Sequence, residues 1–186
     1  DEEDSETPYM TRRAMQFMAE DDGEAPWLLH LSYIKPHWPY MAPAPYHDMY
    51  GPDTFLPVAR DERERKDPHP VFEAFMKMEV SEVFSAQGVR ETVLPAYMGL
   101  IKQCDDQLGR LLDHLEETDT LKNTMIVLTS DHGDYLGDHW LGEKDLFHEP
   151  SVKVPLIIYD PRAQADPARG TTCDALVESI DLAPTF

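Results

Sequence analysis

The sequence predicts an α/β sandwich in which a largely parallel central sheet is flanked by helices, with only part of that fold represented in these 186 residues. Three short apolar runs, at residues 27–33, 125–130 and 154–159, have the composition of strands that are buried on both faces of a sheet. Helical patterns alternate with these runs along the chain. Such alternation is typical of helices packed on a mostly parallel sheet.

The first predicted element is an amphipathic helix at residues 7–20. Met10, Ala14 and Phe17 recur there at helical spacing after a Thr-Pro start. The Asp-Asp-Gly sequence that follows is expected to end this helix. The apolar run 27–33 then follows as the first predicted strand.

A rigid loop is predicted after this strand, at residues 35–40, because the sequence Lys-Pro-His-Trp-Pro-Tyr contains two prolines. Residues 42–90 are rich in proline and in mixed charge, and we expect a loop-rich insertion with small helices. Residues 92–117 are predicted to form the longest helix, since apolar side chains recur at helical spacing between polar ones. The remaining strands are expected at 125–130 and 154–159.

The composition narrows the range of partners. Asp and Glu number 36 against 16 Lys and Arg, and the formal net charge is −20. Nucleic acid and anionic membranes are therefore not expected as partners, and no apolar run is long enough for a membrane span. Cys104 and Cys173 lack zinc-site spacing, so free or buried thiols are expected. Neither the oligomeric state nor the compartment is indicated.

The candidate site lies at the end of the second predicted strand. In open α/β sheets, functional groups gather just beyond the carboxyl ends of the strands. Asp131, His132 and Gly133 follow residues 125–130 at that position. A carboxylate beside an imidazole suits a divalent cation with mixed oxygen and nitrogen ligands, and glycine allows close backbone approach.

Several motifs in order strengthen this hypothesis. Residues 129–139 read TSDHGDYLGDH, 142–144 read GEK, 35–40 read KPHWPY, 121–124 read LKNT and 154–157 read VPLI. Together they resemble the sulfatase and phosphonate monoester hydrolase family of the alkaline-phosphatase superfamily. The resemblance covers most of the chain except the insertion, and it implies that residues 1–186 form a partial catalytic domain with an alkaline-phosphatase-like sandwich fold.

The resemblance also implies roles for individual residues. Asp131 and His132 would be ligands of one divalent metal ion, either calcium, as in sulfatases, or manganese or zinc, as in phosphonate hydrolases. His37 and Lys144 would face the sulfuryl or phosphoryl group, where an ammonium neutralises oxygen charge and an imidazole can protonate the leaving oxygen. His139 would be a substrate-binding residue at the rim.

The family's nucleophile motif, Cys/Ser-x-Pro-x-Arg, is not found in the sequence. Formylglycine, to which that cysteine or serine is often converted, would therefore belong to a residue outside this chain. The family's early Asp-Asp or Asp-Asn ligands are also not found. We therefore expect these 186 residues to be a fragment that is inactive when isolated.

Besides another metal-dependent member of the superfamily, such as a mutase or a phosphodiesterase with a Thr or Ser nucleophile, three functions remain open from the sequence. The first is a metal-dependent hydrolase that acts on a small-molecule sulfate ester, as arylsulfatases do. The second is a phosphonate monoester or phosphodiester hydrolase of the same superfamily, since both transition states share their geometry. The third is a non-catalytic binding or scaffold protein that retained the fold, for which no metal-dependent rise in Tm is expected.

Overall fold

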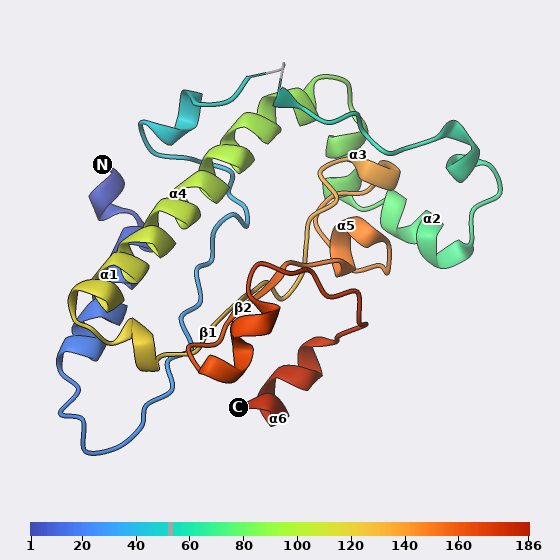
Figure 1. Cartoon of the computed structure of the whole chain (residues 1–186). Helices are drawn as coiled ribbons and strands as arrows, with labels where there is room; N and C mark the ends of the chain where they lie inside the picture. The colour runs from blue at the N-terminus through green and yellow to red at the C-terminus, as the bar shows by residue number, and fades with distance from the viewer. Residues whose placement is uncertain (52–53) are drawn as a thin grey trace.

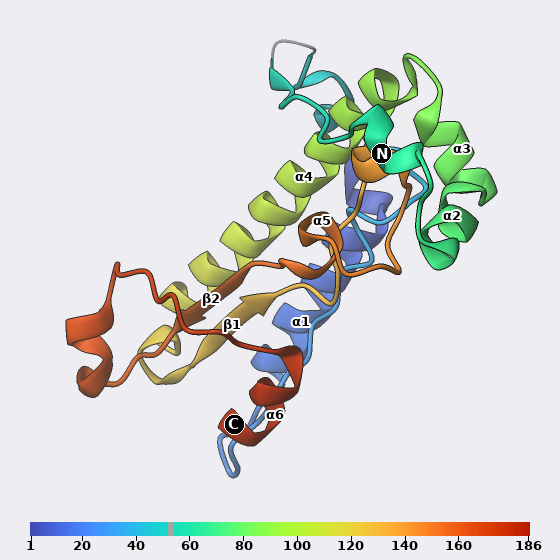
Figure 2. The ribbon, with the colours of Figure 1, turned by 90° about the vertical axis from the view of Figure 1, so that its right-hand side faces the viewer.

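The computed structural model describes residues 1–51 and 54–186. Its helices and strands are α1 (Glu6–Ala19), α2 (Pro70–Met76), α3 (Glu79–Ser85), α4 (Val89–Glu117), β1 (Ile126–Thr129), α5 (Glu149–Val152), β2 (Leu156–Tyr159) and α6 (Leu182–Thr185). Figures 1 and 2 show α1 alongside the C-terminal half of α4, with α2 and α3 near its other end. The predicted helices at 7–20 and 92–117 are confirmed as α1 and α4.

Helices α1 and α4 pack against each other, and each of them buries polar as well as apolar side chains. Ala14 and Thr11 of α1 are buried, as are Gln103 and Leu100 of α4. The buried amide of Gln103 is satisfied, since its Nε2 donates to Ser5 Oγ at 2.9 Å. The contact therefore buries polar groups with hydrogen-bond partners, as a stable interior requires.

The predicted strands at 125–130 and 154–159 form β1 and β2, which pair with Ile126 opposite Tyr159 and Thr129 opposite Leu156. This pair is antiparallel, whereas the sequence predicted mainly parallel strands. The expected burial on both faces is also wrong for this pair: Ile157 is 60% exposed. In the described residues the sheet has two strands, and Leu128 and Ile158 are exposed as well.

The predicted strand at residues 27–33 is wrong. The segment is irregular in the described chain, and its side chains alternate between exposed and half-buried. An extended segment becomes a strand only when a neighbour supplies hydrogen-bond partners for its backbone. The described sheet consists of β1 and β2 and provides none for this segment.

A hydrophobic core beside the candidate site joins four parts of the chain. Phe84 of α3, Leu94 of α4 and Leu136 of the loop after β1 are buried together, and Tyr40 and Tyr97 pack against them. The core therefore fixes the Pro-rich loop at 35–40 against the loop that follows β1. Both loops carry residues of the candidate site.

Cys104 and Cys173 are free thiols, as expected. Burial raises the pKa of the Cys104 thiol to about 12, so this sulfur stays protonated at neutral pH.

None of the described helices combines the length and apolar character that crossing a bilayer requires. The described residues between 42 and 90 contain α2, α3, the start of α4 and short 3-10 turns within irregular chain, and the assignment of this range as an insertion stays a prediction.

Candidate functional site

Asp131 and His132 occupy a tight turn directly after β1. Ser130 Oγ donates to the backbone carbonyl of His132 at 2.7 Å, and the backbone amide of Gly133 donates to the carbonyl of Ser151 at 2.7 Å. A side chain at Gly133 would have no room, because its Cβ would lie 1.9 Å from the carbonyl oxygen of Pro150. The turn is thus pinned against the segment that begins α5.

The carboxylate of Asp131 and the imidazole of His132 have the chemistry and spacing to bind a divalent metal ion. His132 Nδ1 donates to the carbonyl of Gly133 at 2.7 Å, which leaves Nε2 with a free lone pair. Nε2 lies 3.7 Å from Asp131 Oδ2, and two donors this far apart can each reach one ion at about 2.1 Å. A backbone carbonyl that orients the imidazole in this way is typical of metal-binding histidines.

The described residues supply only part of a complete coordination shell. No group of three or more His, Cys, Asp or Glu side chains gathers within residues 1–51 and 54–186 in a way that could hold an ion. Asp131 is exposed, with 87% of its side chain accessible, while His132 is half-buried. The carboxylate therefore has an open side at which further ligands can approach.

His37 and Lys144 meet beside this turn. Lys144 Nζ lies 3.0 Å from His37 Nε2, across 107 residues of sequence, and the His37 ring packs edge-on against His132 with centroids 5.8 Å apart. His37 Nδ1 lies 3.1 Å from the carbonyl of Trp38, which can only accept a hydrogen bond. The proton of the neutral imidazole is therefore on Nδ1, and Nε2 accepts from the Lys144 ammonium.

The loop that carries Lys144 contains a dense run of backbone in the left-handed region. Leu136, His139, Trp140, Glu143 and Asp145 have φ values of 46°, 53°, 62°, 57° and 99°. Such backbone conformations are unfavourable for residues other than glycine, and they persist only when the surrounding structure imposes them. Here Leu136 and Trp140 are buried. Packing thus holds the lysine loop in one shape.

His139 has a different environment from the other four site candidates. Its Nδ1 lies 2.6 Å from Glu64 Oε1, and its ring stacks on His148 with centroids 4.3 Å apart. With His148 and Phe147 it lines a cavity of about 780 Å³, and neither Asp131, His132, His37 nor Lys144 lines that cavity. Its expected role in substrate binding stays a prediction.

These contacts predict a structural effect for His139→Ala. Losing the Glu64 hydrogen bond and the stack on His148 is expected to lower the free energy of unfolding by about 1 to 2 kcal/mol. KM of the full-length protein separates this structural effect from the predicted substrate contact, because a change within about twofold is too small for the loss of such a contact. Urea denaturation and steady-state kinetics measure the two quantities. A severalfold increase in KM at unchanged stability would instead support substrate contact.

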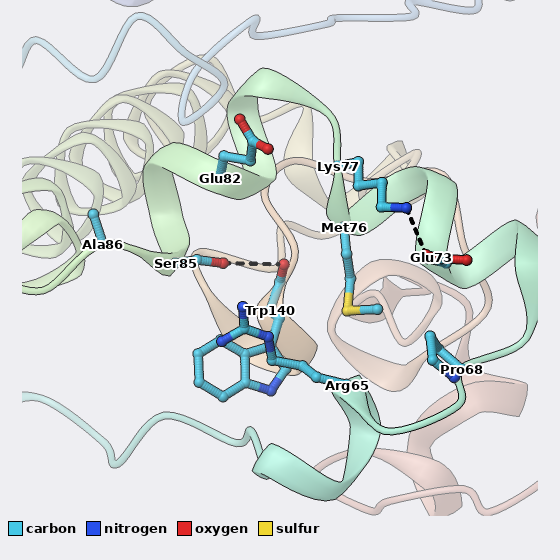
Figure 3. A pocket seen from close by; sticks show the side chains of 9 residues that line it. All are labelled: Arg65, Pro68, Glu73, Met76, Lys77, Glu82, Ser85, Ala86 and Trp140. Atoms are coloured by element: carbon cyan, nitrogen blue, oxygen red, sulfur yellow. Dashed lines mark hydrogen bonds and ion pairs between the residues drawn. The ribbon is translucent and has the colours of Figure 1, made fainter.

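The segment that carries Glu64 wraps around Trp140 in the same loop. The Arg60 and Arg65 guanidinium carbons lie 4.5 and 4.7 Å from the Trp140 ring centroid, and Trp140 Nε1 donates to the carbonyl of Asp61 at 2.9 Å. Figure 3 shows Arg65 against Trp140 at a cavity of about 510 Å³. This cavity shares no lining residue with the group formed by Asp131, His132, His37 and Lys144.

Tyr40 and Asp134 link the two loops of the site, and the sequence did not single out this contact. Tyr40 Oη donates to Asp134 Oδ2 at 2.7 Å across 94 residues. Each residue lies within a recognised motif, but neither motif contains information about the other. Only the folded chain brings the pair together.

The fold class is shown by comparison with solved structures. The chain is similar to phosphonate monoester hydrolase of Agrobacterium radiobacter, with a TM-score of 0.78 and 30% sequence identity over 87% of this chain and 34% of that one. The chain therefore has part of an alkaline-phosphatase-like α/β fold, as the sequence predicted.

Sequence comparison then gives the family. The chain belongs to the sulfatase family, whose sequence model matches residues 5–186. It is 34% identical to a multifunctional alkaline phosphatase superfamily protein of Trinickia caryophylli and 31% identical to an arylsulfatase of Clostridium perfringens, over 98% and 97% of this chain. It spans 37% of each of these relatives. Sulfatases and phosphonate hydrolases are metalloenzymes.

Proposed function

We propose that this chain carries part of the catalytic site of a metal-dependent hydrolase that acts on sulfate esters. The observation that supports this most strongly is the contact between Lys144 Nζ and His37 Nε2 at 3.0 Å, next to the Asp131 and His132 turn. A cation and an imidazole lie together beside two side chains that can bind a metal ion. This combination of groups is suited to hydrolysis of a sulfate or phosphate ester, in which negative charge on the oxygens must be stabilised. The similarity to the arylsulfatase supports the same proposal.

In this proposal Asp131 and His132 hold one divalent ion, calcium or else manganese or zinc. When bound, such an ion supplies Lewis-acid stabilisation of oxyanion charge. Asp131 Oδ2 and His132 Nε2 are the two donors that would hold it. The nucleophile is proposed to come from outside these 186 residues, since the sequence contains no matching motif.

Lys144 and His37 act on the substrate itself. The Lys144 ammonium neutralises charge on the non-bridging oxygens of the sulfuryl group, because it is the cation that the structure holds beside the turn. The hydrogen bond between the two residues contains one proton, donated by Nζ to Nε2. Because Nζ keeps this proton, we propose that the leaving oxygen displaces Lys144 from Nε2, that His37 takes a proton from solvent at Nε2, and that His37 then gives this proton to the leaving oxygen as the general acid and returns to its neutral form. Lys144 keeps its ammonium charge throughout.

A second candidate activity is phosphonate monoester or phosphodiester hydrolysis. The structural similarity to phosphonate monoester hydrolase of Agrobacterium radiobacter favours it. The same four side chains serve both reactions, because the transition states share their geometry and differ mainly in charge. A protein that hydrolyses both ester classes at one site is consistent with these residues.

The activity is tested by assaying the full-length protein with an aryl sulfate and an aryl phosphonate monoester, with and without chelator. We expect turnover of both esters, a higher kcat/KM for the sulfate, and loss of both activities in chelator. A higher kcat/KM for the phosphonate would establish the second candidate instead. No turnover of either ester, together with no metal-dependent rise in Tm, would identify a non-catalytic protein that retained the fold.

A further inference from the structure

One hydrogen bond joins the loop of His37 to the turn of His132. Tyr40 lies three residues after His37, and Asp134 lies two residues after His132. Tyr40 Oη donates to Asp134 Oδ2 at 2.7 Å, across 94 residues of sequence. The two loops that bring the site together are therefore connected by a direct side-chain contact.

Both partners of this bond are held in place by their surroundings. The Tyr40 ring packs edge-on against Phe84 and Tyr97, with centroids 6.2 and 6.1 Å away. The backbone amide of Leu136 donates to the other carboxylate oxygen, Asp134 Oδ1, at 3.1 Å. Burial raises the pKa of the Tyr40 phenol, so the phenol keeps its proton and remains a donor. The bond thus has a fixed direction and a fixed geometry.

The opposite side of the His37 loop is held by a lysine. Lys35 Nζ donates to the carbonyl of Pro39 at 2.8 Å and to the carbonyl of His37 at 3.2 Å. These bonds fix the shape of the loop itself, but they lie within it. The hydrogen bond between Tyr40 and Asp134 ties this shaped loop to the turn that carries Asp131 and His132.

We propose that Tyr40 and Asp134 are positioning residues whose hydrogen bond sets the place of the His37 ring relative to Lys144 and His132. The inference rests on the proposed function for its effect on turnover, and on geometry alone for its effect on the His37 ring. Neither residue touches the substrate in this proposal. Without this hydrogen bond, the His37 ring is expected to occupy its position beside Lys144 and His132 for only a fraction of the time.

The test is Tyr40→Phe in the full-length protein, which keeps the aromatic packing and removes the hydroxyl. We expect kcat to fall by about 10-fold to 100-fold, the scale of a small misplacement of a reacting group. KM and metal affinity are expected to change by less than about twofold, because no ligand contact is lost. Asp134→Asn, which can still pair with the phenol, should retain more of kcat than Asp134→Ala.

A matched control is Tyr46→Phe. Tyr46 is buried, whereas Tyr40 is half-buried. The Tyr46 hydroxyl lies 3.1 Å from Asp106 Oδ2 and 3.2 Å from Glu2 Oε1, on the α1 and α4 side of the molecule. Its loss should lower stability without changing kcat. Combining Tyr40→Phe with Asp134→Ala should cost little more in kcat than either change alone, because both remove one interaction.

A second measurement does not depend on turnover. In ¹⁵N-labelled protein, the ring nitrogens of His37, assigned with His37→Gln, should report a proton on Nδ1 and an acceptor at Nε2. Tyr40→Phe should shift these signals, and Tyr46→Phe should not. Unchanged kcat and unchanged His37 signals in Tyr40→Phe would overturn the positioning role. A wild-type protein without turnover, in which Tyr40→Phe still shifts the signals, would instead contradict the proposed function alone.

Discussion

Replacing Lys144 with alanine is expected to reduce kcat for the aryl sulfate by about 100-fold to 1,000-fold, the usual cost of removing one group that stabilises transition-state charge. Lys144 is the residue whose ammonium lies 3.0 Å from His37. Its loss removes both the positive charge that neutralises the non-bridging oxygens and the hydrogen bond that orients the imidazole. Metal affinity is expected to be nearly unchanged, because Lys144 donates no lone pair to the ion.

The control for this prediction is Lys122→Ala. Lys122 is an exposed lysine in the turn before β1, where it pairs with Asp119. Its replacement removes the same charge from the protein and should leave kcat unchanged. If both variants turned over each ester at the wild-type rate, the role assigned to Lys144 would be wrong, whereas equal losses in both would indicate a general electrostatic effect of net charge.

Asp131→Ala and His132→Ala are each expected to abolish the metal-dependent rise in Tm. An ion present at 100 times its Kd stabilises a folded protein by about 2.7 kcal/mol, and a variant that no longer binds it loses that stabilisation. Thermal unfolding of the full-length protein, titrated separately with calcium, manganese and zinc, measures this effect and ranks the three metals. Activity is expected to fall in parallel with the loss of metal binding.

Asp113→Asn provides the control for the carboxylate. Asp113 is exposed on α4 and does not belong to the turn after β1, so its neutralisation should leave the metal-dependent shift intact. A wild-type shift that persisted in both Asp131→Ala and His132→Ala would contradict their assignment as ligands. A shift lost in Asp113→Asn as well would indicate weak binding of ions to the acidic surface.

Long periodic segments could be predicted well from the sequence. The helices expected at 7–20 and 92–117 are α1 (Glu6–Ala19) and α4 (Val89–Glu117), because an amphipathic pattern sustained over several turns has one obvious folded form. The run at 27–33 shows the limit. An apolar composition favours an extended chain, but strand formation also needs a partner that the sequence pattern does not specify.

Only part of the candidate site, likewise, could be predicted from the sequence. Asp131 and His132 are neighbours in sequence, so their closeness could be expected, and the motifs indicated that His37 and Lys144 belong near them. The bond between Tyr40 and Asp134 could not be predicted, because residue types alone do not reveal a contact across 94 positions. The contacts of His139 with Glu64 and His148 likewise depend on how residues 59–65 fold over the loop after β1.

The separation of His37 from Lys144, 107 residues along the chain, has a consequence for how the protein acquires its site. Contacts between distant residues form late, because the entropy of closing the intervening chain must first be offset. On the ribosome the histidine emerges well before its lysine partner is translated. The residues proposed for chemistry can therefore come together only after most of this chain has been synthesised, and a nascent chain that stalls before Lys144 cannot assemble this group.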